Sequence, residues 1–259
     1  MTLKSLIGKI AFKVICLFIP KSVHYKDMIL PANHLRFCGP EFLDDEYFVT
    51  SALAEADRLV ERFGLTTSSR VLDVGCGVGR LPIGILGRIG EIQHYRGVDV
   101  SNKSIRWCQR YITRRHQSFR FIHIDVKNPR YNPRGKAMDI DFRLPFDDEA
   151  FDIIYLYSVF SHMTTEEIRT YLNEFQRLLA PSGKIFLTAF IGEGVPKMTI
   201  NPPDYVKNWT GALHCVRYDK DFFESLLAEN SFSVDSFTYE KETDRQSAFY
   251  ISRRGKDTS

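Results

Sequence analysis

Three closely spaced glycines after a short apolar run constrain the fold of this 259-residue chain more than any other feature. The run begins at Val71 and contains Asp73, and the glycines follow as Gly75, Gly77 and Gly79. Glycine allows a tight turn from a strand into a helix, and it lets a ligand approach backbone N–H groups at the helix N-terminus. The segment therefore predicts a strand–turn–helix unit with a ligand site at the turn.

Around this unit, apolar segments with the length of strands alternate with segments of helical period. The strands predicted in this way are 70–74, 95–100, 119–124, 151–157, 184–190, 234–239 and 248–253. The predicted helices are 44–63, 81–89, 101–115, 166–179 and 222–229. Such alternation is typical of a mostly parallel sheet with helices on both faces.

The composition is that of one globular domain. Hydrophobic residues are 44% and charged residues 26% of the chain, which excludes disorder, collagen and coiled coil as descriptions of the whole. The net charge of +3 points to no polyanionic partner. The five cysteines form no CxxC pattern, which argues against a disulfide framework and a structural zinc site. We therefore expect no metal and a cytoplasmic location.

The residues around the glycines indicate the kind of ligand. A dinucleotide-binding GxGxxG pattern fails because Arg80 takes the place of its last glycine. Asp73 would repel a pyrophosphate and attract an ammonium group. Asp99 ends the next predicted strand, where a carboxylate can accept hydrogen bonds from both hydroxyls of a ribose. The ligand so described has a ribose and an amino-acid ammonium but no phosphate, and S-adenosylmethionine fits this description.

The segment VLDVGCGVGR resembles the first motif of class I S-adenosylmethionine-dependent methyltransferases. Later segments resemble the family's motifs in the same order, so that the resemblance covers roughly Phe48 to Arg253. It implies an α/β fold with a doubly wound, mostly parallel seven-stranded sheet, helices on both faces and an antiparallel C-terminal strand. It also implies S-adenosylmethionine as the cofactor and S-adenosylhomocysteine as the product.

The resemblance assigns cofactor contacts to residues of this chain. The residues expected at the methionine half are Asp73, Gly75, Cys76, Gly77, Tyr157, Ser158 and Phe160, and Arg80 is also expected to contact the cofactor. The ribose is expected at Asp99, and the adenine at Val100, Asp125 and Val126. A fold that binds the cofactor without catalysis is the alternative.

Methyl transfer needs a general base only where the acceptor must lose a proton. His162 follows the fourth predicted strand of the domain, at the edge where such sheets bind ligands, and is the candidate base. Helix capping or exposure to solvent is the alternative role for this histidine.

The candidate substrate residues come from two irregular segments. Before the first predicted helix of the domain these are His34 and Arg36, and Arg36 could hold a carboxylate or a phosphate. After the fifth strand they are Tyr205, Trp209, His214 and Tyr218, whose aromatic rings could bind a ring or a sugar face. A surface position for the arginine and simple packing for the aromatic residues are the alternatives.

Three parts are expected along the chain. Residues 1–43 are predicted to form an N-terminal helix and a cap or lid, residues 44–255 the methyltransferase domain, and residues 256–259 a tail. Within the domain, residues 192–218 are predicted to form an insertion on the substrate side.

Residues 1–20 are apolar with interspersed lysines, and they are too short and too charged to span a bilayer. A helix that packs on the domain or forms a dimer contact is the preferred interpretation. A basic amphipathic helix in peripheral contact with a membrane is the alternative. The oligomeric state stays open.

Residues 102–136 contain ten Lys and Arg residues and a single acid, Asp125. A basic surface formed by these residues could bind RNA or lipid head groups, but a surface of this kind is more often simply solvated. We therefore do not expect the protein to bind nucleic acid.

The predicted function is that of a methyltransferase that acts on a small molecule, at oxygen. An RNA or protein methyltransferase that uses the basic face is the alternative.

Overall fold

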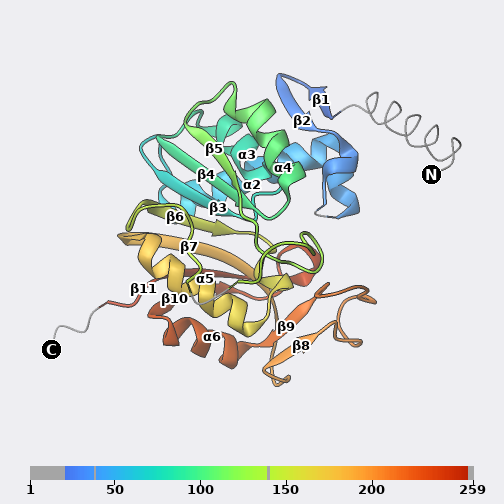
Figure 1. The fold of residues 1–259 in the computed structure, drawn as a ribbon, viewed down its shortest axis with the longest axis vertical. Coiled ribbons are helices and arrows are strands. Elements are labelled where there is room, and N and C mark those ends of the chain that lie inside the picture. The colour runs from blue at the N-terminus through green and yellow to red at the C-terminus, as the bar shows by residue number, and fades with distance from the viewer. Residues whose placement is uncertain (1–20, 38, 139–140, 256–259) are drawn as a thin grey trace, which may run out of the picture.

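The computed structural model describes residues 21–37, 39–138 and 141–255 (Figure 1). The predicted N-terminal helix in residues 1–20 and the predicted tail lie outside the described residues. Among the described residues, no helix is both long enough and apolar enough to cross a membrane.

The predicted mostly parallel sheet with an antiparallel C-terminal strand is confirmed. Seven strands form its main path in the order β10-β11-β7-β6-β3-β4-β5, and β11 runs antiparallel to both of its neighbours. Their bounds are β3 Arg70–Val74, β4 His94–Asp99, β5 Phe119–His123, β6 Phe151–Leu156, β7 Leu179–Gly192, β10 Phe232–Thr238 and β11 Ser247–Arg253.

The predicted number of seven strands is too low, because the sheet has nine strands among the described residues alone. The two further strands are β8 (Met198–Ile200) and β9 (Val216–Asp219), and both begin inside residues 192–218, which the sequence presents as an irregular insertion. Strand β9 pairs in parallel with the end of β7, and β8 pairs antiparallel with β9. The insertion therefore extends the sheet near the carboxyl end of β7.

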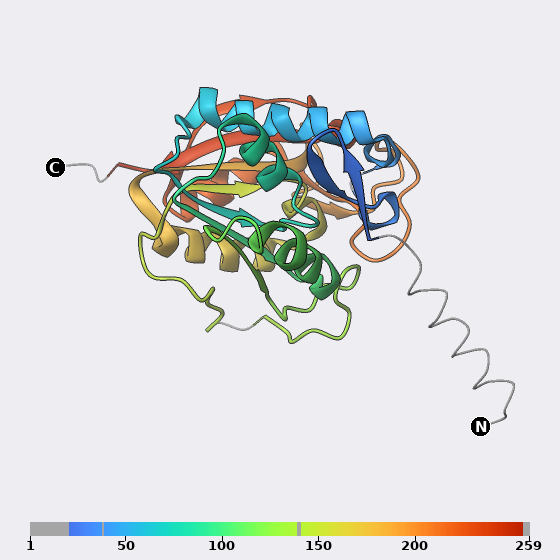
Figure 2. The same ribbon diagram turned by 90° about the horizontal axis from the view of Figure 1, so that it is seen from above.

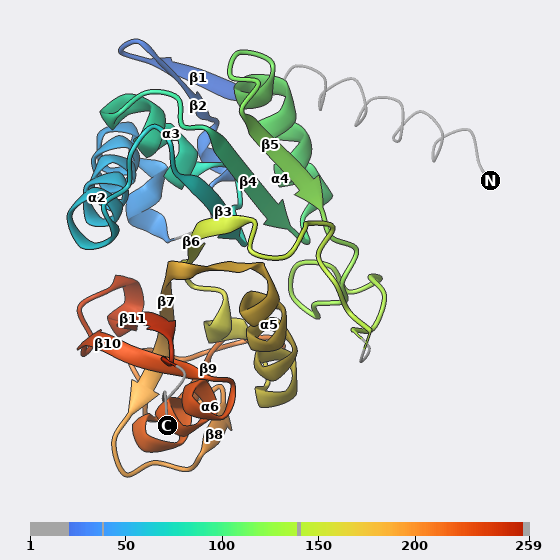
Figure 3. The same ribbon diagram turned by 90° about the vertical axis from the view of Figure 1, so that its left-hand side faces the viewer.

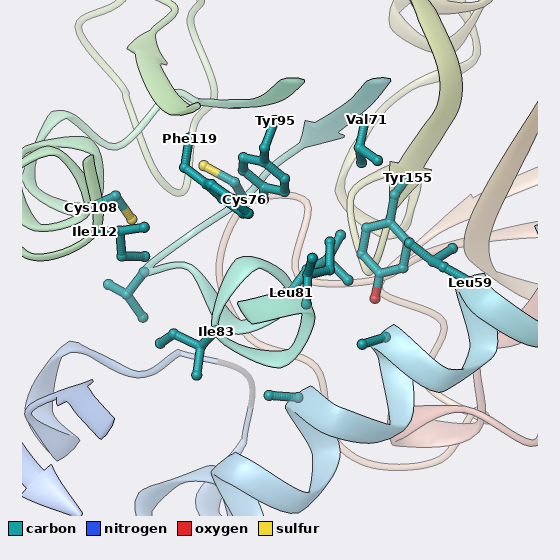
Figure 4. Packing of buried hydrophobic residues seen from close by; sticks show 14 of the residues in the cluster. Leu59, Val71, Cys76, Leu81, Ile83, Tyr95, Cys108, Ile112, Phe119 and Tyr155 are labelled. Atoms are coloured by element: carbon teal, nitrogen blue, oxygen red, sulfur yellow. The ribbon is translucent and has the colours of Figure 1, made fainter. Parts of the chain in front are cut away.

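Helices cover both faces of the sheet, as Figure 2 shows for α2 in light blue and α5 in gold. Their bounds are α2 Asp45–Phe63, α3 Arg80–Arg88, α4 Asn102–Cys108, α5 Thr165–Leu178 and α6 Lys220–Glu229. Side chains of α2, α3 and α4 share one apolar cluster with alternate residues of the strands, and α5 and α6 share a second cluster with the intervening residues. Figure 4 shows the first cluster, in which Tyr95 and Phe119 face side chains of α3 and the end of α4.

Local sequence explains where α2 begins and ends. The Asp44 side chain accepts a hydrogen bond from the Tyr47 N–H at the start of the helix. Gly64 follows the helix with φ 66°, and its N–H donates to the last carbonyls.

Helices α2 and α3 approach each other closely at Gly84. A Cβ at this position would lie 1.9 Å from the Ala52 carbonyl oxygen. Glycine is therefore required for this helix contact, which holds the helix after the glycine turn against the rest of the domain.

The single helix predicted at 101–115 is divided. An α-helical part, α4, passes into a π-helical turn at Gln109–Thr113. Ile112 of this turn is buried and lies against Gly79, where an added Cβ would meet its Cδ1 at 2.7 Å. The π-helical turn therefore packs against the glycine segment.

The N-terminal cap contains a hairpin that the sequence does not reveal. Strands β1 (Ser22–Tyr25) and β2 (Met28–Pro31) pair antiparallel, and two short 3-10 turns at Asn33–Leu35 and Pro40–Leu43 lead into α2. The Trp107 indole N–H donates to the Lys21 carbonyl at 2.6 Å, which joins the cap to α4.

Candidate functional site

A cavity of about 540 Å³ opens at the carboxyl ends of the parallel strands, the edge at which the arrows of β3, β4 and β5 end in Figure 3. Sheets of this kind bind ligands at this edge. The predicted residues that line the cavity are Gly75, Gly77, Asp99, Val100, Val126, Tyr157, Ser158, His162, Trp209 and His214. The described residues contain no cluster of His, Cys, Asp and Glu that could hold a metal ion.

The glycine turn forms one wall of the cavity. Gly75, Gly77 and Gly79 all have positive φ, at 74°, 52° and 81°. A Cβ at Gly77 would meet no atom within 4 Å, whereas a Cβ at Gly75 would lie 2.5 Å from the Val159 side chain. The turn thus exposes backbone to a ligand at Gly77 and packs tightly at Gly75.

Asp99 ends β4 beside this turn. Its carboxylate accepts hydrogen bonds from the Gly77 N–H at 2.8 Å and the Ser101 N–H at 2.6 Å. Burial raises the pKa of Asp99, while these two hydrogen bonds act against the shift. The oxygens are fixed before a ligand arrives, and each retains a lone pair that a hydroxyl could use.

The structure does not bring Asp73, Cys76 or Arg80 to the cavity. Asp73 is buried, and the Tyr95 hydroxyl donates a hydrogen bond to its carboxyl. Burial raises the pKa of Asp73 to about 7, although Tyr95 and the charge of Arg80 lower it. The Arg80 guanidinium lies 4.5 Å from the Tyr157 ring. These three residues are buried in the protein beside or within the glycine turn, away from the cavity.

Asp125 and Phe160 also lie away from the cavity wall. Asp125 is exposed, and its carboxylate accepts a hydrogen bond from the Asn132 side chain at 3.1 Å. Phe160 is fully buried and stacks with Phe175 of α5 at 6.4 Å between ring centroids. Ile124, which carries no sequence signal of a site, lines the apolar wall together with Val100 and Val126.

A polar network fixes the chain at the end of β6. Ser158 has φ 58°, and its N–H donates to the Thr188 hydroxyl at 2.8 Å. The Gln246 side chain accepts from that hydroxyl at 2.8 Å and donates to the Ser158 hydroxyl at 2.9 Å. Gln246 and the neighbouring Thr243 line the cavity from a loop that carries no sequence signal of a site.

His162 lies on the cavity wall in a short 3-10 turn at Phe160–His162. Its Nδ1 is 3.0 Å from the Leu213 carbonyl, so Nδ1–H donates and Nε2 keeps its lone pair. Burial lowers the pKa of His162 to about 4, and the nearby charges of Arg130 and His214 contribute to the shift. The ring is therefore uncharged at neutral pH.

The candidate substrate residues separate into two groups. Trp209 and His214 line the cavity, with their rings 5.1 Å apart in an edge-to-face contact. Tyr218 is fully buried and donates to the Met163 carbonyl at 2.6 Å, whereas Tyr205 is buried and donates to the Arg245 carbonyl at 3.1 Å. Both tyrosines pack the insertion instead of facing the cavity.

The N-terminal candidates do not reach the cavity either. His34 is exposed, away from the cavity wall. Arg36 is 5% exposed, and its guanidinium forms an ion pair with Asp45 and donates to four backbone carbonyls of the cap and the start of α2. The proposed capture of a substrate anion by Arg36 is therefore replaced by a structural role. Phe37 and Gly39 of the same segment do line the cavity.

Comparisons with known proteins show which proteins the chain is similar to. A family profile described as a methyltransferase domain matches residues 71–183. An uncharacterised protein of Haemophilus influenzae is 26% identical over 71% of this chain, but the match spans only 66% of its own length, just under two thirds. The O-methyltransferase rstn1 of Aspergillus nomiae is also 26% identical, over 73% of this chain and 75% of its own length.

Solved structures share the fold at lower sequence identity. The [4+2]-cyclase SpnF superposes with a TM-score of 0.57 at 16% identity, and the match covers 80% of this chain and 82% of SpnF. The 1,6-didemethyltoxoflavin-N1-methyltransferase of Burkholderia thailandensis has a TM-score of 0.54 at 16% identity, with 82% of each chain covered.

Proposed function

Because the chain is a class I S-adenosylmethionine-dependent methyltransferase, we propose that it methylates a small-molecule acceptor at an oxygen atom. The observation that carries the proposal is a single cavity that runs from the glycine turn to an aromatic wall at Trp209 and His214. Its volume, about 540 Å³, lies within the range of roughly 300–1,000 Å³ that is typical of small-molecule sites. Oxygen is supported by the relative named an O-methyltransferase.

The cavity residues fit the cofactor. The Asp99 carboxylate, fixed by two backbone N–H groups, would bind the ribose hydroxyls, and the open backbone at Gly77 would lie beside the methionine half. The apolar side chains of Val100, Ile124 and Val126 would pack against the adenine. When bound, S-adenosylmethionine supplies an electrophilic methyl group on a positively charged sulfur.

The chain contributes alignment and exclusion of water. Much of the rate of such a displacement comes from holding the acceptor oxygen in line with the methyl group. Phe190 and Trp209 form an apolar wall, and their rings are 5.1 Å apart. The uncharged His162 would add no positive charge to a cavity that binds a sulfonium, and its Nε2 lone pair could accept a hydrogen bond from an acceptor hydroxyl.

Two further functions are tested by the same experiment. Exposed basic side chains on α4 and the following turn, Lys103, Arg106, Arg110 and Arg114, favour the RNA or protein alternative. SpnF, which is named a [4+2]-cyclase, shares the fold, so the fold by itself leaves a protein that binds the cofactor without catalysis as the second alternative.

The test combines cofactor binding with a substrate survey. Calorimetry with S-adenosylhomocysteine is expected to show binding to the wild type, and Asp99→Ala should weaken it by roughly tenfold or more because bonds to a charged acceptor are lost. Asp147→Ala, which removes an exposed carboxylate that does not line the cavity, is the matched control and should change little. Absence of binding by the wild type would refute the proposal.

Turnover then separates the three functions. Release of S-adenosylhomocysteine is measured with hydroxylated and carboxylated small molecules, with total RNA and with a protein mixture. Turnover with the small molecules supports the proposal. Turnover only with RNA or protein supports the basic-face alternative, and binding without any turnover supports the non-catalytic one.

A further inference from the structure

Where the loop after β5 and the insertion line the cavity, the described residues include three cationic side chains. Lys127 and Arg130 come from the loop after β5, and Lys207 comes from the insertion. All three are exposed and line the cavity. The charges that face them decide whether this wall could bind an anion.

The acidic groups that line the cavity are already engaged. Asp99 accepts from two backbone N–H groups beside the glycine turn. Glu167 accepts from the Thr164 N–H at 2.7 Å and the Thr164 hydroxyl at 3.0 Å, where it caps α5. Asp244 accepts from the Lys207 ammonium group at 2.8 Å. Lys207 is therefore neutralised by Asp244. The carboxylates of Asp99 and Glu167 are engaged by hydrogen bonds at the glycine turn and at the start of α5.

Arg130 is not neutralised in this way. Its Nε donates to the Tyr131 hydroxyl at 3.1 Å, and its guanidinium carbon lies 5.5 Å from the Tyr131 ring. Within residues 21–37, 39–138 and 141–255, neither terminal nitrogen of Arg130 has a hydrogen-bond partner or an ion pair. These two nitrogens can bind a carboxylate or a phosphate with paired hydrogen bonds.

The backbone that carries Arg130 is ordered. The buried Asn128 side chain accepts hydrogen bonds from the N–H groups of Arg130 and Tyr131, both at 3.0 Å. The backbones of Asn128 and Asn132 pair with each other across this turn. Gly135 closes the turn, because a Cβ there would lie 2.6 Å from the Val126 carbonyl. The guanidinium is thus presented from a fixed turn, which lowers the entropic cost of binding.

Arg130 belongs to the same wall as the two histidines of the site. Burial lowers the pKa of both His162 and His214, and the positive charge of Arg130 lowers them further. The rings of Tyr131 and His162 are 5.7 Å apart in an edge-to-face contact. The cavity lining also includes apolar and aromatic side chains, namely Met138, Met163, Tyr171, Phe190 and Trp209.

We propose that the methyl acceptor is an apolar, ring-bearing small molecule with a carboxylate or phosphate group, and that Arg130 binds this anionic group. The inference rests on the proposed function and adds the chemical class of the acceptor. It gives Arg130 the role that the sequence suggested for Arg36, whose guanidinium is occupied by the cap. A carboxylate oxygen could itself be the methylated atom without a general base, which agrees with the uncharged, weakly basic His162.

The experiment uses the full-length protein saturated with S-adenosylhomocysteine. Binding of benzoate, phenyl phosphate and benzamide is compared by calorimetry and by ligand-detected NMR. Benzoate and phenyl phosphate are expected to bind more tightly than the neutral benzamide, and the stronger of the two distinguishes a carboxylate from a phosphate. Arg130→Gln should weaken binding of the preferred anion roughly tenfold and leave benzamide unchanged.

Arg134→Gln is the matched control, because Arg134 is exposed on the same loop and does not line the cavity. It should bind all three probes like the wild type. Affinity for S-adenosylhomocysteine is measured separately in each variant and should not change.

Three results would overturn the inference. In the first, the wild type shows no preference for either anion over benzamide. In the second, Arg134→Gln weakens anion binding as much as Arg130→Gln. In the third, Arg130→Gln loses affinity for S-adenosylhomocysteine itself, which would assign Arg130 to the cofactor carboxylate. Failure of the wild type to bind S-adenosylhomocysteine is a different result, and it refutes the proposed function.

Discussion

The buried carboxyl of Asp73 makes the stability of this fold depend on pH. Asp73 is 3% exposed on the sheet face that carries Tyr95, whose hydroxyl donates to the carboxyl. Burial raises its pKa from 3.8 to about 7. The folded protein therefore retains a proton on this group over a pH range in which the unfolded chain has lost it.

The sign and the size of the effect follow from proton linkage. Between the unfolded and folded pKa values the folded state binds more protons, so the free energy of unfolding falls as the pH rises, and it levels off above the folded pKa. With pKa values of 3.8 and about 7, the contribution of Asp73 falls by roughly 2–3 kcal/mol between pH 5 and pH 8.

Asp73→Asn isolates this contribution, because asparagine keeps an acceptor for the Tyr95 hydroxyl and cannot ionise. Urea unfolding of the wild type and the variant is measured at pH 5 and at pH 8. The difference in unfolding free energy should move in favour of the variant by roughly 2–3 kcal/mol at the higher pH. Asp147→Asn, which removes an exposed carboxylate, is the control and should show no comparable change. The same difference for Asp73→Asn at both pH values would refute the reasoning.

Three other predictions concern the helix contact, the histidine and the N-terminus. Gly84→Ala should destabilise the fold by about 3 kcal/mol or more in urea unfolding, because its Cβ would meet the Ala52 carbonyl, whereas Gly90→Ala, at an open position, should cost less. Once an acceptor with a reacting hydroxyl has been identified, His162→Ala should lower kcat for it by roughly 100-fold. The wild-type kcat should then show no titration between pH 6 and pH 8, since the pKa of His162 is about 4. Full-length protein should float with anionic liposomes, and protein that lacks residues 1–20 should not, if that segment contacts membranes.

The main strands were predictable because they are buried on both faces. Such strands read as nearly continuous apolar runs, and β3 was predicted with its observed bounds. The sequence did not reveal four strands, β1, β2, β8 and β9, which have three or four residues each. In β1 and β8, most side chains are only partly buried. A strand of this length carries too few apolar positions to show an alternation. Its pairing depends on neighbours that are distant in the sequence.

The cavity residues proposed to bind the cofactor could be predicted where they lie at the ends of strands. Asp99 ends β4 and Ser158 follows β6 at the carboxyl edge, and both line the cavity. Asp73 lies one residue before the end of β3, so the alternation of the strand turns it toward the helices α2 and α3, and Val74 faces the cavity instead. A one-residue difference along the strand therefore separates a cavity residue from a buried support.

The residues proposed to bind the methyl acceptor could not be predicted in the same way, as Arg36 and Arg130 show. Arg36 and Arg130 both occur in irregular segments with prolines, asparagines and nearby aromatic residues. Their roles differ because of backbone carbonyls that only the fold brings near. The turn before α2 ends with carbonyls of Phe42, Leu43 and Asp44 that point at Arg36 and occupy its guanidinium. The turn at Asn128 satisfies its own backbone through the asparagine side chain, and the two terminal nitrogens of Arg130 have no partner within the part of the chain that the structure describes. An arginine in a loop is thus available to a substrate when the loop already has its own hydrogen bonds.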